Sequence, residues 1–235
     1  MQGIVRTART TGLLYFGLAL TGMLGFLYVR GQLHVAGAPD ETLTNLVGRE
    51  GLARLGIALE FGIVLTQALV AVWFFKLFRP VNVVAAGSIA AFGLMNAAAI
   101  LASSAALSTA LAVALDPALA PGGDAAAVVQ ALYALSDGFW SGGAIFFGLW
   151  LIPMGDAVLI SRWMPRVLGY VLIAGGIGYV ASAFVKVLLP DASAVYGALS
   201  VPATIGEFWI LGYLIVLGVR MPRASAAPAP AMPNA

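Results

Sequence analysis

Two glutamates lie inside segments that are otherwise apolar enough to cross a membrane. Glu207 interrupts the stretch VPATIGEFWILGYLIVLG at 201–218, and Glu60 interrupts the apolar run at 53–75. An ionisable side chain at membrane depth costs several kcal/mol, so it usually faces the interior of a helix bundle or a water-filled cavity. There a carboxyl can donate a proton, bind a cation or anchor a polar head group, and two close together would share one proton.

A third polar side chain, Asn96, falls at a similar depth. At about 1.5 Å of rise per residue, Glu60, Asn96 and Glu207 lie about 24, 26 and 20 Å from the basic residue near one end of each segment. Gln67 follows Glu60 by seven residues and therefore projects from the same helix face. Arg54 lies above Glu60, and its long side chain can reach toward it or toward the surface. We therefore predict a polar, ligand-binding cavity that opens to the outer face, lined by the first three residues, with Arg54 near its mouth.

A structural interpretation of the same residues stays open. Each glutamate, protonated, would then hydrogen-bond to a neighbouring helix and hold the bundle together. For Asn96 this structural role is favoured. Asp137 and Asp156 lie near the ends of the fourth apolar segment and are expected to be solvated or to cap a helix, and His34 is expected to be a surface histidine.

The composition is that of an integral membrane protein. Of 235 residues, 61% are hydrophobic and only 9% are charged, whereas a soluble domain carries about 25% charged residues. The net charge of +2 comes from scattered basic residues, so no nucleic-acid partner is predicted. The chain has no cysteine and one histidine, which excludes disulfides, thiolate metal sites and bis-histidine haem. No cofactor and no metal site are predicted.

Charge-free runs of about 20 residues, enough to cross about 30 Å of hydrocarbon, predict an all-α bundle of six transmembrane helices. The third run is long, because no charge appears between Val81 and Leu115. We interpret it as one helix that extends past the bilayer, followed by a break at 116–123 and a short helix capped by Asp124. A seventh crossing within 105–136 stays open as an alternative. The predicted spans are 11–29, 53–75, a span beginning near 82, 138–160, 167–189 and 198–219.

The distribution of Lys and Arg predicts the orientation, because cytoplasmic loops carry an excess of them. Eight lie on the side of the N-terminus and four on the other, so both termini are expected in the cytoplasm. The first side holds Arg6, Arg9, Lys76, Arg79, Arg162, Arg166, Arg220 and Arg223, and the second holds Arg30, Arg49, Arg54 and Lys186.

The second side also carries a predicted short helix, APDETLTNLV, with Asp40 as its N-cap. Residues 1–222 are expected to form a single domain, and the Ala/Pro-rich tail at 223–235 is expected to be disordered.

The order and spacing of several local patterns resemble a bacterial membrane-protein family, domain of unknown function 4386. The matching stretches are TGLLY at 11–15, VRGQL at 29–33, EGLARLGIA at 50–58, LFRPVN at 77–82, MPRVLGY at 164–170 and VPATIGEFWI at 201–210. The family usually has Asp at the position of Glu60 and often a basic residue near Gly93, which this chain lacks. The resemblance implies six spans and a bacterial cytoplasmic (inner) membrane, and it implies no activity.

Three functional classes are compatible with these observations. The favoured one is a non-enzymatic membrane protein whose partners are membrane lipids and which holds a lipid, a small amphiphile or a membrane partner in the predicted cavity. The second is a cofactor-free enzyme that uses Glu60 and Glu207 as acid and base on a lipid or isoprenoid. The third is a proton-coupled transporter, for which a broken helix at Pro202 is the one supporting feature. The oligomeric state stays open.

Overall fold

A computed structural model describes residues 2–220 of the chain. That range contains six helices long and apolar enough to cross a membrane, which confirms the predicted all-α fold and the number of spans. The first crossing joins three pieces, and each of the others is a single helix. The bounds are α1 (Gln2–Gly22), a π-helical segment (Met23–Val29) and α2 (Arg30–Leu33), then α4 (Glu50–Phe78), α5 (Val83–Leu115), α6 (Ala125–Ser161), α7 (Arg166–Leu188) and α8 (Ser193–Val216).

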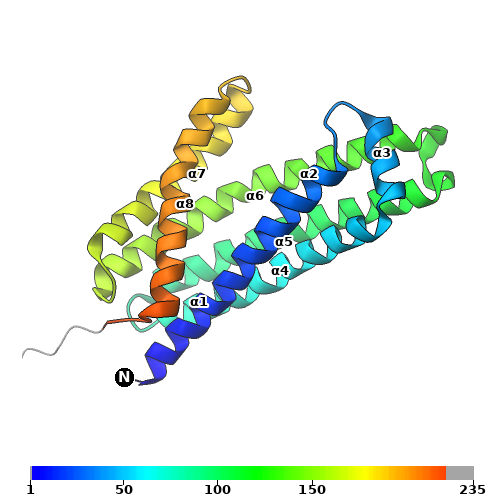
Figure 1. The fold of residues 1–235 in the computed structure, drawn as a ribbon. Helices are drawn as coiled ribbons and strands as arrows, with labels where there is room; N and C mark the ends of the chain where they lie inside the picture. Colours follow the sequence, from blue (N-terminus) through cyan, green and yellow to red (C-terminus); the bar gives the residue numbers. More distant parts are fainter. Residues whose placement is uncertain (1, 221–235) are drawn as a thin grey trace, which may run out of the picture.

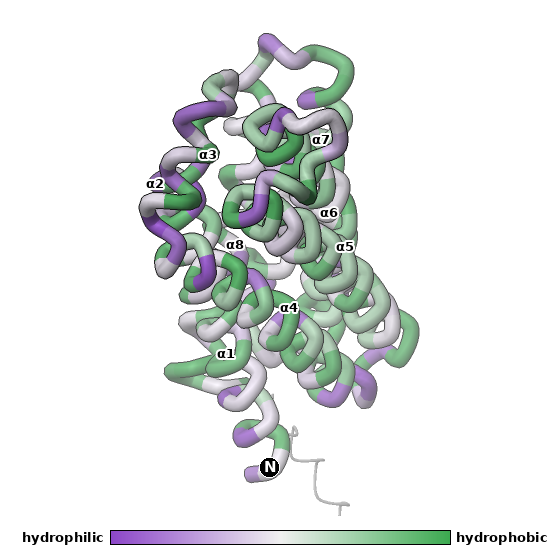
Figure 2. Tube along the Cα trace, turned by 90° about the vertical axis from the view of Figure 1, so that its right-hand side faces the viewer, coloured by the Kyte–Doolittle hydropathy of each residue, from purple (hydrophilic) through white to green (hydrophobic). Residues whose placement is uncertain are grey.

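The six crossings alternate in direction, so the connections gather at two ends (Figure 1). One end, called here the basic end, holds the start of α1, the turns at 79–82 and 162–165 and the end of α8. The other, called the loop end, holds the connections at 34–49, 116–124 and 189–192. Hydrophilic residues gather at both ends, and the helices between them are mostly apolar (Figure 2).

The helices form a ring that closes toward the basic end. Each helix packs against its neighbours in the chain, from α4 on α5 through to α7 on α8, while α1 packs against both α4 and α8. The contact of α1 with α8 lies toward the basic end, where a Cβ atom on Gly12 would meet Leu214 and Ile215 at 2.9 Å. The ring therefore encloses an interior that side chains from all six crossings can reach.

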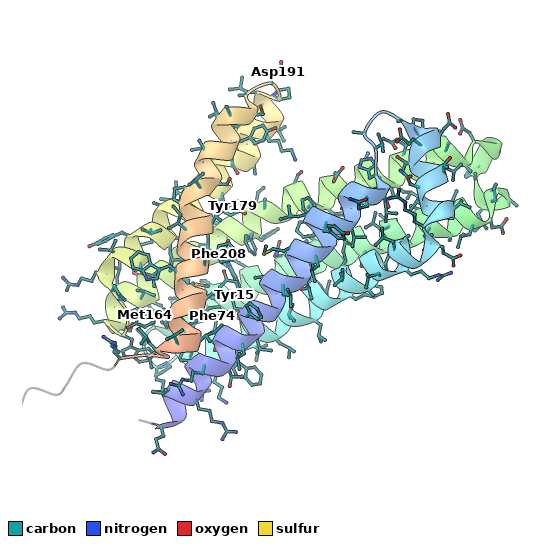
Figure 3. All side chains as sticks on the ribbon, in the orientation of Figure 1. Tyr15, Phe74, Met164, Tyr179, Asp191 and Phe208 are labelled. Carbon is teal, nitrogen blue, oxygen red and sulfur yellow. The ribbon has the colours of Figure 1, made fainter. Side chains whose placement is uncertain are left out.

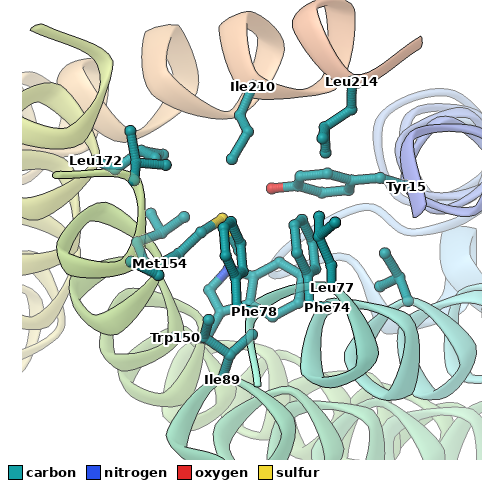
Figure 4. Packing of buried hydrophobic residues seen from close by; sticks show 14 of the residues in the cluster. Tyr15, Phe74, Leu77, Phe78, Ile89, Trp150, Met154, Leu172, Ile210 and Leu214 are labelled. Atoms are coloured by element: carbon teal, nitrogen blue, oxygen red, sulfur yellow. The ribbon is translucent and has the colours of Figure 1, made fainter. Parts of the chain in front are cut away.

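An aromatic core fills the ring near the basic end (Figure 4). Tyr15 of α1 packs edge-on against Phe74 of α4 and Trp150 of α6, with ring centroids 5.8 and 5.6 Å apart. Leu214 and Ile210 of α8 cover the same cluster from the other side. Offset and edge-on aromatic pairs are favourable beyond the area they bury, so this cluster fixes how four helices meet below the cavity described next.

The loop end has its own core and extends beyond the hydrocarbon. At about 1.5 Å per residue, α5 and α6 are about 50 and 55 Å long, against about 30 Å of hydrocarbon. A short helix, α3 (Pro39–Gly48), packs across both. The connection at 116–124 consists of short 3₁₀ turns, so residues 105–136 add no seventh crossing.

Two expected helix starts need correction. The fourth crossing does not begin near 138 after a separate short helix, because α6 runs without a break from Ala125; nothing in AAAVVQALYALS interrupts it. Asp124 is its N-cap, as predicted, with the side chain accepting a hydrogen bond from Ala127 N at 2.9 Å. In α3 the N-cap is Ala38 rather than Asp40, since Pro39 takes the first helical position, where its missing N–H is not needed.

Glycines let α7 approach both of its neighbours. A Cβ atom on Gly176 would meet the carbonyl oxygen of Gly148 on α6 at 2.6 Å, and one on Gly175 would meet the Cα atom of Ala203 on α8 at 2.5 Å. Only some of the small residues of α7 lie at these contacts. Gly178 is buried, but Ala174 is exposed. Such close backbone approach is typical of membrane helices.

We predict that Gly175→Ala destabilises the protein by about 1–3 kcal/mol, because the added methyl group must push α7 and α8 apart. The matched control is Gly197→Ala on α8, where an added Cβ atom meets nothing within 4 Å. Alanine there should be neutral or stabilising by about 0.5–1 kcal/mol, because glycine is unfavourable inside a helix. Unfolding in lipid–detergent micelles measures both, and equal stability of the two variants would contradict the packing described.

Candidate functional site

A cavity of about 320 Å³ lies inside the ring, above the aromatic core. Its wall is mostly apolar and aromatic, with side chains from all six crossings. Few polar groups reach it: the carboxyl of Glu207, the amides of Gln67 and Asn96, and the hydroxyl groups of Tyr15 and Thr204 are among them. A mainly apolar pocket with a few convergent polar groups is the usual form of a small-molecule site.

Glu207 is held in the wall by a hydrogen bond from Tyr15. The phenol hydroxyl of Tyr15 donates to Oε1 of Glu207 at 2.6 Å, and this contact joins α1 to α8. Within residues 2–220 no lysine, arginine or histidine nitrogen lies within 4 Å of the Glu207 carboxyl. The second oxygen of this carboxyl is therefore available to a group that enters the cavity.

The amide of Gln67 is the second polar group of the wall. The side chain is fully buried, and neither Oε1 nor Nε2 has a hydrogen-bond partner. A buried polar group without a partner costs about 1–3 kcal/mol. Asn96, which is 6% exposed, lies in the same wall. A bound molecule that supplies donors and acceptors here would remove that cost.

The cavity opens sideways, between α1 and α8. The contacts of these two helices run from the basic end as far as Tyr15 and Glu207. Beyond that level the wall includes Met23, the first residue of the π-helical segment, and Phe208 of α8, which are 50% and 55% exposed. Tyr15 and Phe208 lie where α8 crosses α1, and the α7–α8 hairpin leads away to Asp191 (Figure 3). The opening therefore faces the membrane rather than the loop end.

A second polar cluster lies nearer the loop end, around Arg30. Its guanidinium is 9% exposed, forms an ion pair with Asp137 at 2.8 Å, and lies 3.6 Å from Glu60. It also donates to the Ser136 hydroxyl at 3.0 Å and to the Tyr133 carbonyl at 3.3 Å. One arginine thus balances two carboxylates on two other helices.

Glu60 is almost completely enclosed in this cluster. Ser103 of α5 donates to its Oε2 at 3.0 Å, and Trp140 of α6 donates through Nε1 to its Oε1 at 3.1 Å. Ser103 is also hydrogen-bonded to Ser136 at 2.6 Å. Trp140 lines the main cavity as well, so its indole ring separates the cluster from the cavity.

The predicted site residues are thus divided between two places. Glu207 and Asn96 lie in the wall of the main cavity, whereas Glu60 lines a smaller one together with Arg30. Arg54 is in neither. It is 62% exposed on the surface of α4 and pairs with Glu50, one turn earlier, at 2.7 Å.

The partners of these glutamates are not evident in the sequence. The position of Arg30 predicts a loop residue that sets orientation, and the position of Asp137 predicts a solvated or capping role. One signal was available for α6, since Tyr133, Ser136, Asp137 and Trp140 follow the three- and four-residue spacing of one helix face. Arg30 comes directly after the π-helical segment, an irregularity often found at functional sites and not visible in the sequence.

His34 is also less exposed than expected. Its ring stacks on that of Tyr133 with centroids 4.7 Å apart, and Nε2 lies 3.4 Å from the amide nitrogen of Gln130. Burial lowers the pKa of His34 below its ordinary value, and the nearby Arg30 lowers it further, while Asp137 opposes both. Histidine 34 is therefore part of the packing around Arg30 rather than a free surface group.

The fold and the site define a multi-pass helical membrane protein with a buried charge cluster and a cavity open to the membrane. A family model, domain of unknown function (DUF4386), matches residues 10–218, and the chain belongs to this family. The resemblance seen in the sequence is thereby confirmed. No match was found among curated proteins or among solved structures.

We predict that Arg30→Met lowers the free energy of unfolding by about 3 kcal/mol, because it removes the cation beside the buried Glu60 and leaves the half-exposed Asp137 without its ion-pair partner. Arg54→Ala is the matched control. It removes an exposed ion pair, which contributes at most about 1 kcal/mol. Thermal unfolding in lipid nanodiscs would measure both variants. Equal losses would show that the Arg30 cluster is no more important than a surface pair.

Proposed function

We propose that the protein binds a lipid or small amphiphile, with the polar head against Glu207, Gln67 and Asn96 and the apolar part directed between α1 and α8. The observation that carries the proposal is a mainly apolar cavity with a small polar region around Glu207, Gln67 and Asn96 and an opening that faces hydrocarbon. A ligand with both a polar and an apolar part satisfies both regions of the wall at once. Water alone would leave the apolar wall solvated, and an apolar molecule alone would leave Gln67 unpaired.

The exposed sides of the opening support the same assignment. Met23 and Phe208 are large apolar residues, and Leu211 continues the wall inward. In a membrane these side chains contact acyl chains, so a bound tail can leave the cavity without meeting water. The cavity volume of about 320 Å³ is enough for a head group and part of a chain.

An acid–base enzyme with Glu60 and Glu207 as its pair has less support. Such a pair must reach one substrate from both sides, but Glu60 is hydrogen-bonded to Ser103 and Trp140 outside the main cavity. A transporter has no additional support either, since α8 continues through Pro202 as one helix.

We further propose that the basic end faces the cytoplasm of a bacterial cell and that the protein lies in its inner membrane. Lys76, Arg79, Arg162 and Arg166 flank the two short turns of the basic end. Orientation follows the number of Lys and Arg residues near the membrane, and this number is larger at the basic end than at the loop end. The excess favours a cytoplasmic location for the basic end.

Filling the cavity tests the binding function. Ala144 of α6 lines the cavity, and Ala144→Phe should remove the space for a ligand, so that lipid retained by the purified wild-type protein is lost. Native mass spectrometry of protein released from nanodiscs counts the retained molecules.

The control is Ala174→Phe, which adds the same side chain on an exposed face of α7. It should retain as much lipid as the wild-type protein. If Ala144→Phe perturbs folding, Ala19→Phe on α1 closes the cavity from another side. Full retention by both cavity variants would contradict the proposal.

A further inference from the structure

We infer that the preferred ligand carries a cationic head, an ammonium group attached to an apolar chain. The inference rests on the proposed function, because it specifies the chemistry of the head group that the same cavity holds. It is carried by the charges and aromatic rings around Glu207.

The cavity wall has one carboxyl and no basic side chain. Among the residues that line it, Glu207 is the one with a carboxyl group, and none is lysine, arginine or histidine. Tyr15 satisfies one oxygen of that carboxyl at 2.6 Å but brings no positive charge. A charge in a low-dielectric interior is costly unless an opposite charge accompanies it. An ammonium head supplies that charge, whereas a sulfate or phosphate alone would add a second negative charge.

Aromatic rings make up much of the rest of the wall. Tyr15, Trp140, Phe147, Tyr179 and Phe208 all line the cavity. Aromatic faces attract cations, and clusters of them are a recurrent solution for binding quaternary ammonium groups. Leucine and valine would line a cavity for a purely apolar ligand equally well. The aromatic rings therefore favour a cationic ligand in addition to the charge of Glu207.

The unpaired amide gives a third contribution. Gln67 is fully buried with Oε1 free, and Asn96 lies beside the same space. The partial negative charge of an amide oxygen attracts any ammonium group, and a primary or secondary ammonium group also donates a hydrogen bond to it. A bare metal ion fits less well, because the described residues include no group of three or more His, Cys, Asp or Glu side chains that could hold one.

The test compares four ligands that share one bromine-labelled undecyl chain and differ in the head: trimethylammonium, sulfate, maltoside and phosphocholine. The protein is held in phosphatidylcholine-free nanodiscs, and bromine quenching of tryptophan fluorescence is measured. Trp140→Phe removes the one cavity-lining tryptophan, so the difference between this variant and the wild-type protein isolates binding in the cavity.

We expect the trimethylammonium ligand to bind at least about tenfold more tightly than the maltoside. Glu207→Gln keeps the hydrogen bond from Tyr15 but removes the charge, and should weaken trimethylammonium binding by about 10- to 100-fold. It should change maltoside binding by less than about twofold. Glu50→Gln, at a partly exposed position outside the cavity, should change neither. Tyr179→Leu should weaken the cation more than the neutral ligand, which tests the aromatic contribution independently of Glu207.

The outcomes separate the two proposals. If no ligand quenches Trp140, amphiphile binding itself fails. If the maltoside or the sulfate binds as tightly as the cation and Glu207→Gln has no effect, binding stands and the cationic preference is overturned. If phosphocholine binds as tightly as trimethylammonium, the preference holds with a phospholipid head as the source of the ammonium group. If phosphocholine binds much more weakly than trimethylammonium, the cationic preference also holds, with a free cationic amphiphile as the source of the ammonium group.

Discussion

The dominant constraint on this bundle is that hydrocarbon supplies no hydrogen-bond partners, so polar groups must be paired within the protein. The chain meets it differently at two levels. Near the loop end Arg30 joins two carboxyls, and hydroxyl and indole donors complete the coordination of Glu60. Nearer the basic end Glu207 has one phenol donor, and Gln67 has no partner at all. At the first level most polar groups are paired within the protein, although Arg30 Nη1 has no hydrogen-bond partner. At the second level a ligand would supply the missing partners.

The ring is held unevenly, and this leaves the cavity accessible. The basic end is closed by the aromatic core, and the loop end of α5 and α6 is covered by α3. The α7–α8 hairpin is held mainly through its basic half, where Gly175 and Gly176 permit close backbone contact. Between residues 179 and 202 it has no buried residue. The outer half of the hairpin therefore has no core of its own, and the contact between α8 and α1 ends near Tyr15.

The crossings were predictable because length and apolarity decide them, and so was the importance of Glu60 and Glu207, because few charges fall at membrane depth. Depth alone could not show which way a side chain points. By residue count Glu60 and Glu207 share a layer, yet Glu60 is hydrogen-bonded to Ser103 and Trp140 nearer the loop end, while Gln67, on the same face of α4, lines the main cavity. Tyr15 could not be distinguished from other aromatic residues, since its role depends on α1 meeting α8, a pairing between opposite ends of the chain.

The two levels are joined through Trp140. Its indole nitrogen donates to Glu60, while the residue also lines the cavity that contains Glu207. The Phe26 ring packs against the same indole at an interplanar angle of 42°, with centroids 4.5 Å apart, and Arg30 lies over the Phe26 ring. An indole held by both a hydrogen bond and a packed ring has little freedom to turn, so the charge cluster determines the shape of one cavity wall. The buried ion pairs thus position an aromatic surface of the site without contacting a ligand themselves.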